Sequence, residues 1–211
     1  MNFIFIFKSC FNETISRYKK INKEITQYGN SIKSILRKHA KIRLSRMSVL
    51  DIGCGNGFFE FALSPYVKTI YGIDPSLHML KDARLNNKSY KFKNIRFYKG
   101  SAENIPFIKK FDLILFSYSL HFTKDPETVL NTVLSNLKKN GLLLILEPTK
   151  TFTKNGKFDR GCKNFNKRMY DGKQKALVQT RSIIDDFSDE HEILYMKHDN
   201  KVYWILLRIN N

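Results

Sequence analysis

A glycine-rich stretch in the first third of the chain offers the clearest chemistry in this sequence. It reads Val49-Leu50-Asp51-Ile52-Gly53-Cys54-Gly55-Asn56-Gly57 and joins an apolar run to a helical pattern. Glycines at a strand-to-helix turn let the backbone approach a ligand closely, with N–H groups of the helix start directed at it. A dinucleotide-binding turn would need glycine at position 58, where this chain has Phe58. Asp51 would repel a pyrophosphate, but it suits a cationic ligand.

A second carboxylate stands at the equivalent place on the next predicted strand. Asp74 lies in the run Tyr71-Gly72-Ile73-Asp74-Pro75-Ser76. An acid there can accept hydrogen bonds from the two ribose hydroxyls of a nucleoside. Two structural alternatives stay open, in which Asp51 caps the next turn or Asp74 caps the helix before Pro75. Because both acids stand at matching strand ends, we favour a role in ligand binding.

Strand and helix patterns alternate from about residue 48 to residue 148. The predicted strands are short and apolar, and they cover residues 49–52, 69–73, 95–98, 112–116 and 142–146. The predicted helices cover residues 57–63, 76–85 and 125–139. Ser76 is a plausible N-cap of the second helix, and Gly141 lies just past the end of the third. This alternation indicates a parallel sheet with helices on both faces.

The two ends of the chain differ from this middle part. Residues 163–187 look helical apart from Gly172, and residues 191–196 and 202–209 predict an antiparallel hairpin. At the start, residues 13–46 predict a basic helical segment that breaks at Gly29-Asn30. We therefore expect an N-terminal helical segment over residues 1–45 and a single domain over residues 46–211.

An apolar stripe runs along the N-terminal segment. It includes Ile25, Ile32 and Leu36 at helical spacing. Ordinary core packing is one interpretation of this stripe. The other is a lid that closes over a ligand and hinges near Gly29-Asn30.

The chain resembles class I S-adenosylmethionine-dependent methyltransferases, in the branch that includes quinone-biosynthesis and other small-molecule enzymes. The glycine turn, Asp74, the run 100–107 (GSAENIPF) and the run 111–121 carry this resemblance, which covers roughly residues 46–148. It implies an α/β fold, a Rossmann-like three-layer sandwich. The expected sheet has seven strands, is mostly parallel and ends in a C-terminal antiparallel hairpin.

The resemblance also implies a set of residues that hold S-adenosylmethionine, whose product is S-adenosylhomocysteine, and it implies no metal. The glycine turn would hold the methionine moiety, with Asp51 toward its amino group, and Asp74 would bind the ribose. Related enzymes commonly have Asp where Ser101 stands, and Ser101 is a weaker acceptor for the adenine amino group. Cys54 is expected to pack rather than react. The implied cofactor-binding residues are Asp51, Gly53, Cys54, Gly55, Asn56, Gly57, Asp74, Pro75, Met79, Ser101, Ala102, Glu103, Phe116 and Ser117.

Methyl transfer from a sulfonium needs mainly an in-line approach, because the leaving thioether is neutral. A base matters only when the acceptor must lose a proton. His121, just past the fourth predicted strand, is the candidate for a general base or an orienting group. The alternative is that it packs against Phe122. Tyr118 is the next candidate for lining the acceptor site.

Motifs beside the fourth strand disfavour two kinds of acceptor. Adenine amino methylation usually goes with an N-P-P-Y-like run, where this chain has Phe116-Ser117-Tyr118-Ser119, and cytosine C5 methylation uses a Pro-Cys nucleophile that is absent there. A small-molecule acceptor leads. The alternatives are an RNA (tRNA) methyltransferase and a catalytically weak S-adenosylmethionine-binding module.

Composition and charge bound the remaining possibilities. An apolar content of 42% is enough for a core, and no apolar run approaches the roughly 20 residues that a membrane span needs. Three scattered cysteines indicate a reducing cytoplasm rather than a disulfide framework. The net charge is +18, and residues 1–48 carry 11 basic and 2 acidic side chains. That excess fits either a nucleic-acid partner or AT-rich coding.

Overall fold

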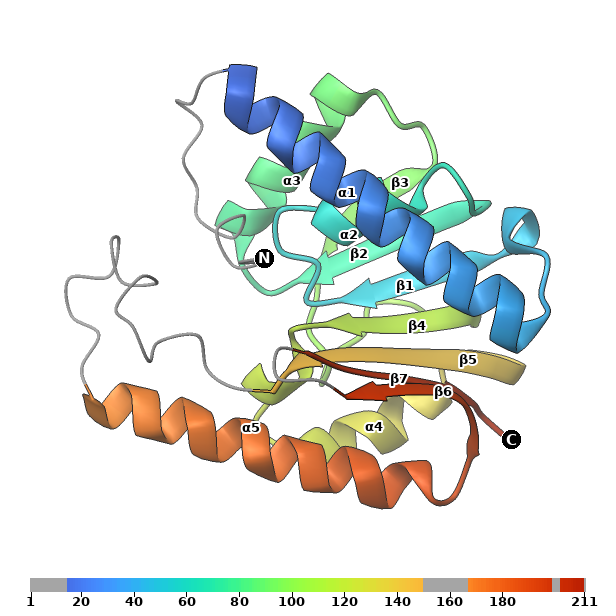
Figure 1. Cartoon of the computed structure of the whole chain (residues 1–211), viewed down its shortest axis with the longest axis vertical. Coiled ribbons are helices and arrows are strands. Elements are labelled where there is room, and N and C mark those ends of the chain that lie inside the picture. The colour runs from blue at the N-terminus through green and yellow to red at the C-terminus, as the bar shows by residue number, and fades with distance from the viewer. Residues whose placement is uncertain (1–14, 150–166, 199–201, 211) are drawn as a thin grey trace.

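A computed structural model describes residues 15–149, 167–198 and 202–210 of the chain. Within these ranges, seven strands form one sheet in the order β3-β2-β1-β4-β5-β7-β6 (Figure 1). Strands β1 to β5 pair in parallel, and β7 runs antiparallel to both of its neighbours. The strand bounds are β1 Ser48–Ile52, β2 Thr69–Asp74, β3 Ile95–Lys99, β4 Phe111–Ser117, β5 Leu137–Pro148, β6 Glu192–His198 and β7 Val202–Arg208. The predicted seven-stranded, mostly parallel α/β fold is therefore confirmed.

Helices cover both faces of this sheet and complete the three layers (Figure 1). One face carries α1 (Ile15–Ile35), α2 (Phe58–Leu63) and α3 (Leu77–Tyr90), and the other carries α4 (Pro126–Leu134) and α5 (Lys167–Ser188). Each face has its own buried cluster, because alternate residues of a strand point to opposite sides of the sheet. No helix among the described residues is long and apolar enough to cross a membrane.

The strand order reverses at β1. From β1 the chain winds outward through β2 to β3, and then returns to lay β4 on the other side of β1. In open α/β sheets, ligands bind beyond the carboxyl ends of the strands at such a reversal. The ends of β1 and β4 lie side by side, since Ile52 pairs with Phe116. The residues after Ile52 and around Ser117 therefore lie at the same edge of the sheet.

Two predicted helix boundaries are wrong. The helix predicted over residues 125–139 ends at Leu134, and Leu137 already belongs to β5, where it pairs with Phe111. Leu137 is fully buried there, so its apolar character fits a strand as well as a helix. Gly141 lies inside β5 rather than at a helix end. The helix predicted over residues 76–85 is right in place but continues to Tyr90.

The predicted break at Gly29-Asn30 is also wrong. Helix α1 runs through both residues and continues into a π-helical turn, Leu36–Ala40. A Cβ atom on Gly29 would lie 2.2 Å from the carbonyl oxygen of Ala62, so this glycine lets α1 approach α2 closely. Ile32 and Leu36 are fully buried on the same face. The described part of the stripe packs in the core, and a hinge at Gly29 has no structural basis.

We expect Gly29→Ala to destabilise the protein by about 1–3 kcal/mol, because the added methyl overpacks a backbone contact. A glycine in an unobstructed helix would give the opposite sign, since alanine there is stabilising by roughly 0.5–1 kcal/mol. Urea denaturation measures the difference. Gln27→Ala, at an exposed position of the same helix, is the control and should change stability by less than about 0.5 kcal/mol. A stabilised Gly29→Ala variant would contradict the close packing of α1 on α2.

Candidate active site

The glycine turn between β1 and α2 has a backbone that suits glycine. Gly53, Gly55 and Gly57 have φ angles of 78°, 54° and 91°, in the left-handed region that side chains rarely adopt. A Cβ atom on Gly53 would lie 2.4 Å from the Cβ of Ser119, in the loop after β4. The N–H groups of Gly53 and Cys54 donate to the carbonyl of Ile73 at 2.8 and 2.9 Å. The turn is therefore anchored to β2 and held tightly against the end of β4.

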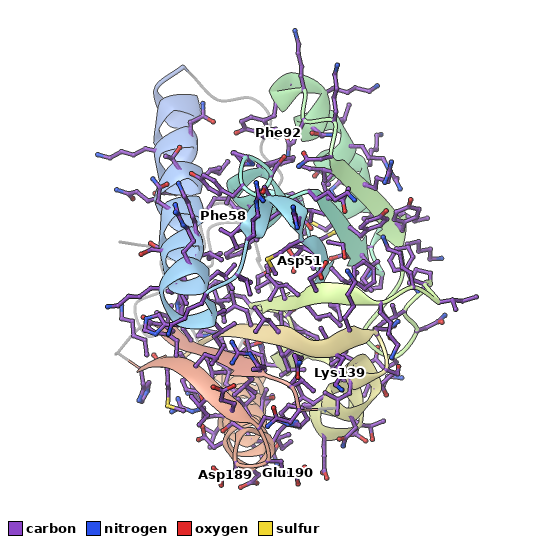
Figure 2. All side chains as sticks on the ribbon, turned by 90° about the vertical axis from the view of Figure 1, so that its right-hand side faces the viewer. Asp51, Phe58, Phe92, Lys139, Asp189 and Glu190 are labelled. Atoms are coloured by element: carbon purple, nitrogen blue, oxygen red, sulfur yellow. The ribbon has the colours of Figure 1, made fainter. Side chains whose placement is uncertain are left out.

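Asp51 lies in the interior behind this turn, with only 1% of its surface exposed. Figure 2 shows it near the centre of the molecule. The hydroxyl of Ser117 donates to its Oδ1 at 3.1 Å, so the two predicted residues meet across β1 and β4. Burial raises the pKa of Asp51 to about 7. A carboxylate held in this way can bind a cation but caps no turn.

Asp74 joins two loops at the end of β2. Its Oδ2 accepts a hydrogen bond from the N–H of Gly55 at 2.9 Å, and its Oδ1 accepts one from the N–H of Ser76 at 2.8 Å. Ser76, as predicted, is the N-cap of α3, since its hydroxyl accepts from the N–H of Met79 at 3.3 Å. The alternative in which Asp74 caps that helix is wrong. Each carboxylate oxygen has a second lone pair, so Asp74 can also accept from ligand hydroxyls.

A turn over residues 101–104 lies beside Asp74, since the N–H of Gly100 donates to the carbonyl of Asp74 at 3.3 Å. Ala102 is buried, whereas the side chain of Glu103 is exposed. The pKa of Glu103 is lowered by hydrogen bonds, first from its own backbone N–H and also from the hydroxyl of Ser101. The Ser101 side chain therefore lies near the Glu103 carboxyl group.

The loop after β4 brings His121 to the same edge of the sheet. Nδ1 of His121 lies 2.5 Å from Oε2 of Glu147, near the end of β5. The other oxygen of Glu147 accepts from the N–H of Leu120 at 2.8 Å, so the carboxyl group is fixed at both ends. The ring of His121 also lies 4.0 Å from that of Phe122, which is the predicted packing contact. Both interpretations of His121 have a structural counterpart.

Tyr118 holds the loop in a conformation uncommon for an aromatic residue. Its φ angle is 58°, and its N–H donates to the carbonyl of Leu146 at 2.8 Å. The hydroxyl of Ser119 donates to the carbonyl of Ile52 at 2.5 Å and so ties the loop back to β1. Backbone strain of this kind persists where surrounding contacts hold it, and it is common at functional sites.

The other predicted cofactor-binding residues differ in their burial. Phe116 is fully buried in the cluster on the α4 and α5 face, opposite to Asp51. Pro75 is exposed beside Asp74, and Met79 is half-buried. Cys54 is a buried free thiol whose pKa burial raises well above its usual range, so it packs as predicted. Cys10 and Cys162 lie outside the described residues.

Two acids in the site were missed by sequence reasoning. Glu60 of α2 is fully buried and faces Asp51, and Glu147 orients His121. Glu60 stands within the apolar run Phe58–Leu63, and Glu147 directly follows the apolar run Leu142–Leu146. An acid within such a run is costly to bury without a partner, and this was the available signal.

The site fits a nucleoside that carries a cationic amino acid group. Buried Asp51 can face the ammonium group, Asp74 has acceptor capacity for ribose hydroxyls, and Gly53 keeps the turn beside Ser119 free of a side chain. These three features come from separate strands and loops, and the topology brings them to one edge.

We expect Asp74→Ala to weaken binding of S-adenosylhomocysteine by about ten- to 150-fold, the loss of a charged hydrogen bond of roughly 1.5–3 kcal/mol. The variant also leaves the N–H groups of Gly55 and Ser76 without their acceptor. Isothermal titration calorimetry measures the change. Asp82→Ala, which removes an acid of α3 that lies 3.7 Å from His78, is the control and should bind normally. Unchanged affinity in a folded Asp74→Ala variant would exclude a ribose contact.

Comparisons with known proteins place the chain among methyltransferases. The sequence model of the family described as "Methyltransferase domain" matches residues 44–206. A demethylmenaquinone methyltransferase of Lactococcus lactis is 33% identical over 141 residues, which are 65% of this chain and 56% of that protein. A ubiquinone/menaquinone biosynthesis C-methyltransferase, UbiE, of Campylobacter jejuni is 30% identical over 167 residues, 74% of this chain and 68% of its own.

A solved structure gives the same fold. The SAM-dependent methyltransferase of Aquifex aeolicus superposes with a TM-score of 0.62 at 19% identity, and the match covers 89% of this chain and 97% of that one. The chain spans little more than half of the Lactococcus relative, 56% of its length.

Proposed function

This chain belongs to the methyltransferase domain family, within the class I S-adenosylmethionine-dependent superfamily, and from that premise we propose that it methylates a small molecule. The observation that carries the proposal is the meeting of Asp51, Asp74 and the glycine turn at the carboxyl edge of the sheet. Bound S-adenosylmethionine would supply an electrophilic methyl group, whose bond to sulfur would break as the acceptor attacks the methyl carbon in line and S-adenosylhomocysteine leaves.

The chain's own residues divide the work of binding. The glycine turn and Asp51 hold the methionine end, and Asp74 holds the ribose. Met79, Ala102 and the backbone of Glu103 line the adenine end. Ser117, which donates to Asp51, lies beside the place where donor and acceptor meet. A metal has no part in this proposal.

His121 and Glu147 supply the proton chemistry. The Glu147 carboxylate beside Nδ1 favours the tautomer that carries its proton there, which leaves Nε2 as an acceptor. Nε2 then takes the proton that a phenol or hydroxyl of the acceptor loses. The exposed ring of Phe122 gives the neighbouring surface an aromatic character, and half-buried Tyr118 packs against the core with its ring near that of Phe59. The names of the two relatives point to quinone precursors, and we propose an aromatic acceptor of that kind.

A labelled-methyl transfer assay on fractionated cell extract tests this proposal. We expect label from S-adenosylmethionine in the small-molecule fraction and none in the RNA or protein fractions. Label in RNA would move the assignment to a tRNA-type methyltransferase. Cofactor binding without transfer to any fraction would instead favour a catalytically weak S-adenosylmethionine-binding module.

We also propose a cytoplasmic location, because the chain has only three cysteines.

An RNA partner is the second candidate, and a basic groove favours it. Lys33, Arg37, Lys41 and Arg43 line a groove of about 570 Å³ that no described acid lines. None of these four forms an ion pair with an acid among the described residues. Part of its lining, residues 41–45 and 65–66, comes just before β1 and β2 in the chain, whereas Asp74 lies at the other end of β2. A small molecule therefore remains the first choice as acceptor.

Salt-dependent binding of bulk tRNA tests the second candidate. Four phosphate contacts predict a slope of log K against log salt of about −3. The double variant Arg37→Glu/Arg43→Glu should flatten that slope. Lys81→Glu/Lys88→Glu changes the net charge equally at exposed positions of α3, and it should leave binding unaltered. An equal loss of tRNA affinity in both double variants would show that binding depends on overall charge and not on this groove.

A further inference from the structure

Glu60 is a buried acid with no cation among its described neighbours. It stands in the first turn of α2, directly after the glycine turn, and none of its surface is exposed. Its side chain reaches over β2, where a Cβ on Gly72 would lie 2.4 Å from its Oε1. Gly72 pairs with Asp51 in the sheet, so the Glu60 carboxyl lies over the Asp51 carboxyl.

The hydrogen bonds of the two carboxyl groups differ. Asp51 accepts from the hydroxyl of Ser117 at 3.1 and 3.4 Å from its two oxygens. The oxygens of Glu60 accept no well-formed hydrogen bond from a described donor, although its own backbone N–H lies near enough to lower the pKa of the carboxyl group. A hydrogen bond between two carboxyl groups requires a proton on one of them. Ser117 stabilises the charge on Asp51, so the proton belongs on Glu60.

The surrounding charges favour the same arrangement. Asp51, Cys54 and Asp74 are the titratable groups that act on Glu60 or share its surroundings. Burial and then the charge of Asp51 raise the pKa of Glu60 well above its usual range. No lysine, arginine or histidine within the described ranges forms an ion pair with Glu60 or Asp51. Two ionised carboxylates side by side in this interior would repel each other strongly.

We infer that Glu60 is a neutral acid in the folded protein at neutral pH and a positioning residue for the cofactor, because it donates its proton to the Asp51 carboxylate. The positioning role of Glu60 rests on the proposed function, whereas its neutral state does not. A neutral Glu60 leaves a single negative charge at this place, which matches the single ammonium group of the methionine moiety. Its hydrogen bond fixes the direction of the Asp51 carboxylate before the ligand arrives.

A neutral acid in the folded state has a consequence for stability that needs no ligand. The unfolded chain loses the Glu60 proton above its ordinary pKa of 4.5, whereas the folded chain keeps it. The folded state therefore loses stability as the pH rises, by up to about tenfold in the folding equilibrium constant per pH unit. Glutamine keeps an N–H donor for Asp51 and cannot ionise, so Glu60→Gln removes this loss.

The first arm of the test compares urea unfolding of the wild type and Glu60→Gln from pH 5 to pH 8. We expect the variant's advantage in folding equilibrium constant to grow by up to about tenfold per pH unit, or 1.36 kcal/mol. Glu127→Gln, at an exposed position of α4, is the control and should show no such growth. A Glu60→Gln variant less stable than the wild type at pH 8, or an advantage that does not change with pH, would overturn the inference.

The second arm measures binding of S-adenosylhomocysteine against pH by calorimetry. Glu60→Gln should bind within about threefold of the wild type, and Glu60→Met, which removes the donor, should bind about tenfold more weakly at pH 7. The loss in Glu60→Met should shrink as the pH rises, because Asp51 without its donor ionises at a higher pH. Weak binding by Glu60→Gln at every pH would show that a charged Glu60 binds the ligand. If the wild type binds nothing, the proposed function fails while the first arm still decides the protonation of Glu60.

Discussion

Gly53→Val is expected to abolish binding of S-adenosylhomocysteine, a loss of at least about a thousandfold or 4 kcal/mol. The φ angle of Gly53 is 78°, which a β-branched residue does not adopt without strain. A Cβ at this position would lie 2.4 Å from that of Ser119, so either the glycine turn or the loop after β4 must move. Either displacement changes the turn and loop against which the methionine end is proposed to lie. Calorimetry measures the affinity, and thermal unfolding verifies that the variant is folded.

Asn56→Ala changes a side chain of the same predicted cofactor-binding turn but keeps the turn's backbone, and it is the matched control for Gly53→Val. Asn56 lies in the same turn at a φ angle that is not positive, so alanine introduces no backbone strain there. Its carbonyl oxygen, which accepts from Asn86 at 3.1 Å, remains in place. We expect less than about a tenfold loss of affinity in this control. Tight binding by a folded Gly53→Val variant would mean that the ligand does not contact the glycine turn.

His121→Gln is expected to lower kcat by about 10²- to 10⁴-fold, the usual contribution of a general base. Glu147→Gln should lower it by about 10²-fold, because the amide still accepts from Leu120 but no longer fixes the histidine tautomer. Neither side chain holds the cofactor in the proposed site, so the affinity for S-adenosylhomocysteine should stay unchanged. Steady-state kinetics, with the acceptor that the labelled-methyl assay identifies, separates the two quantities.

Phe122→Leu distinguishes the base from a packing role. The ring of Phe122 lies 4.0 Å from that of His121 and is mostly exposed. If His121 serves only to pack at the rim, Phe122→Leu should reduce activity as much as His121→Gln does. We expect Phe122→Leu to keep kcat within about fivefold, since exposed apolar contacts contribute little. Full activity in the His121→Gln variant would show that His121 is not the general base.

Local sequence patterns were sufficient for the elements with strong signals. The glycine turn, the acid at the end of β2 and the N-cap Ser76 depend on spacing within a few residues, and the structure has each of them where predicted. The boundary of α4 was missed because a buried leucine such as Leu137 fits the apolar face of a helix as well as a buried strand. A break at Gly29 was wrongly predicted because glycine at a close helix contact and glycine at a helix end look the same in sequence.

The two overlooked acids depend on tertiary contacts. Glu60 in the first turn of a helix looks like an ordinary acid that favours the helix dipole. Only the placement of α2 over β1 and β2 brings it against Asp51. Glu147 lies 26 positions from His121, and the pairing of β4 with β5 joins them. The roles assigned to the cofactor-binding residues by resemblance remain predictions.

The most direct test of the proposed cofactor site locates the bound ligand on the protein. Amide chemical shifts of isotope-labelled protein, followed during titration with S-adenosylhomocysteine, report which residues contact the ligand. We predict saturable shifts at Gly53, Gly55, Asp74 and Ala102, with none at Lys33 or Arg43 beyond small changes. Saturation with shifts confined to the basic groove, or no shifts at all in the folded protein, would contradict a cofactor site at the carboxyl edge of the sheet.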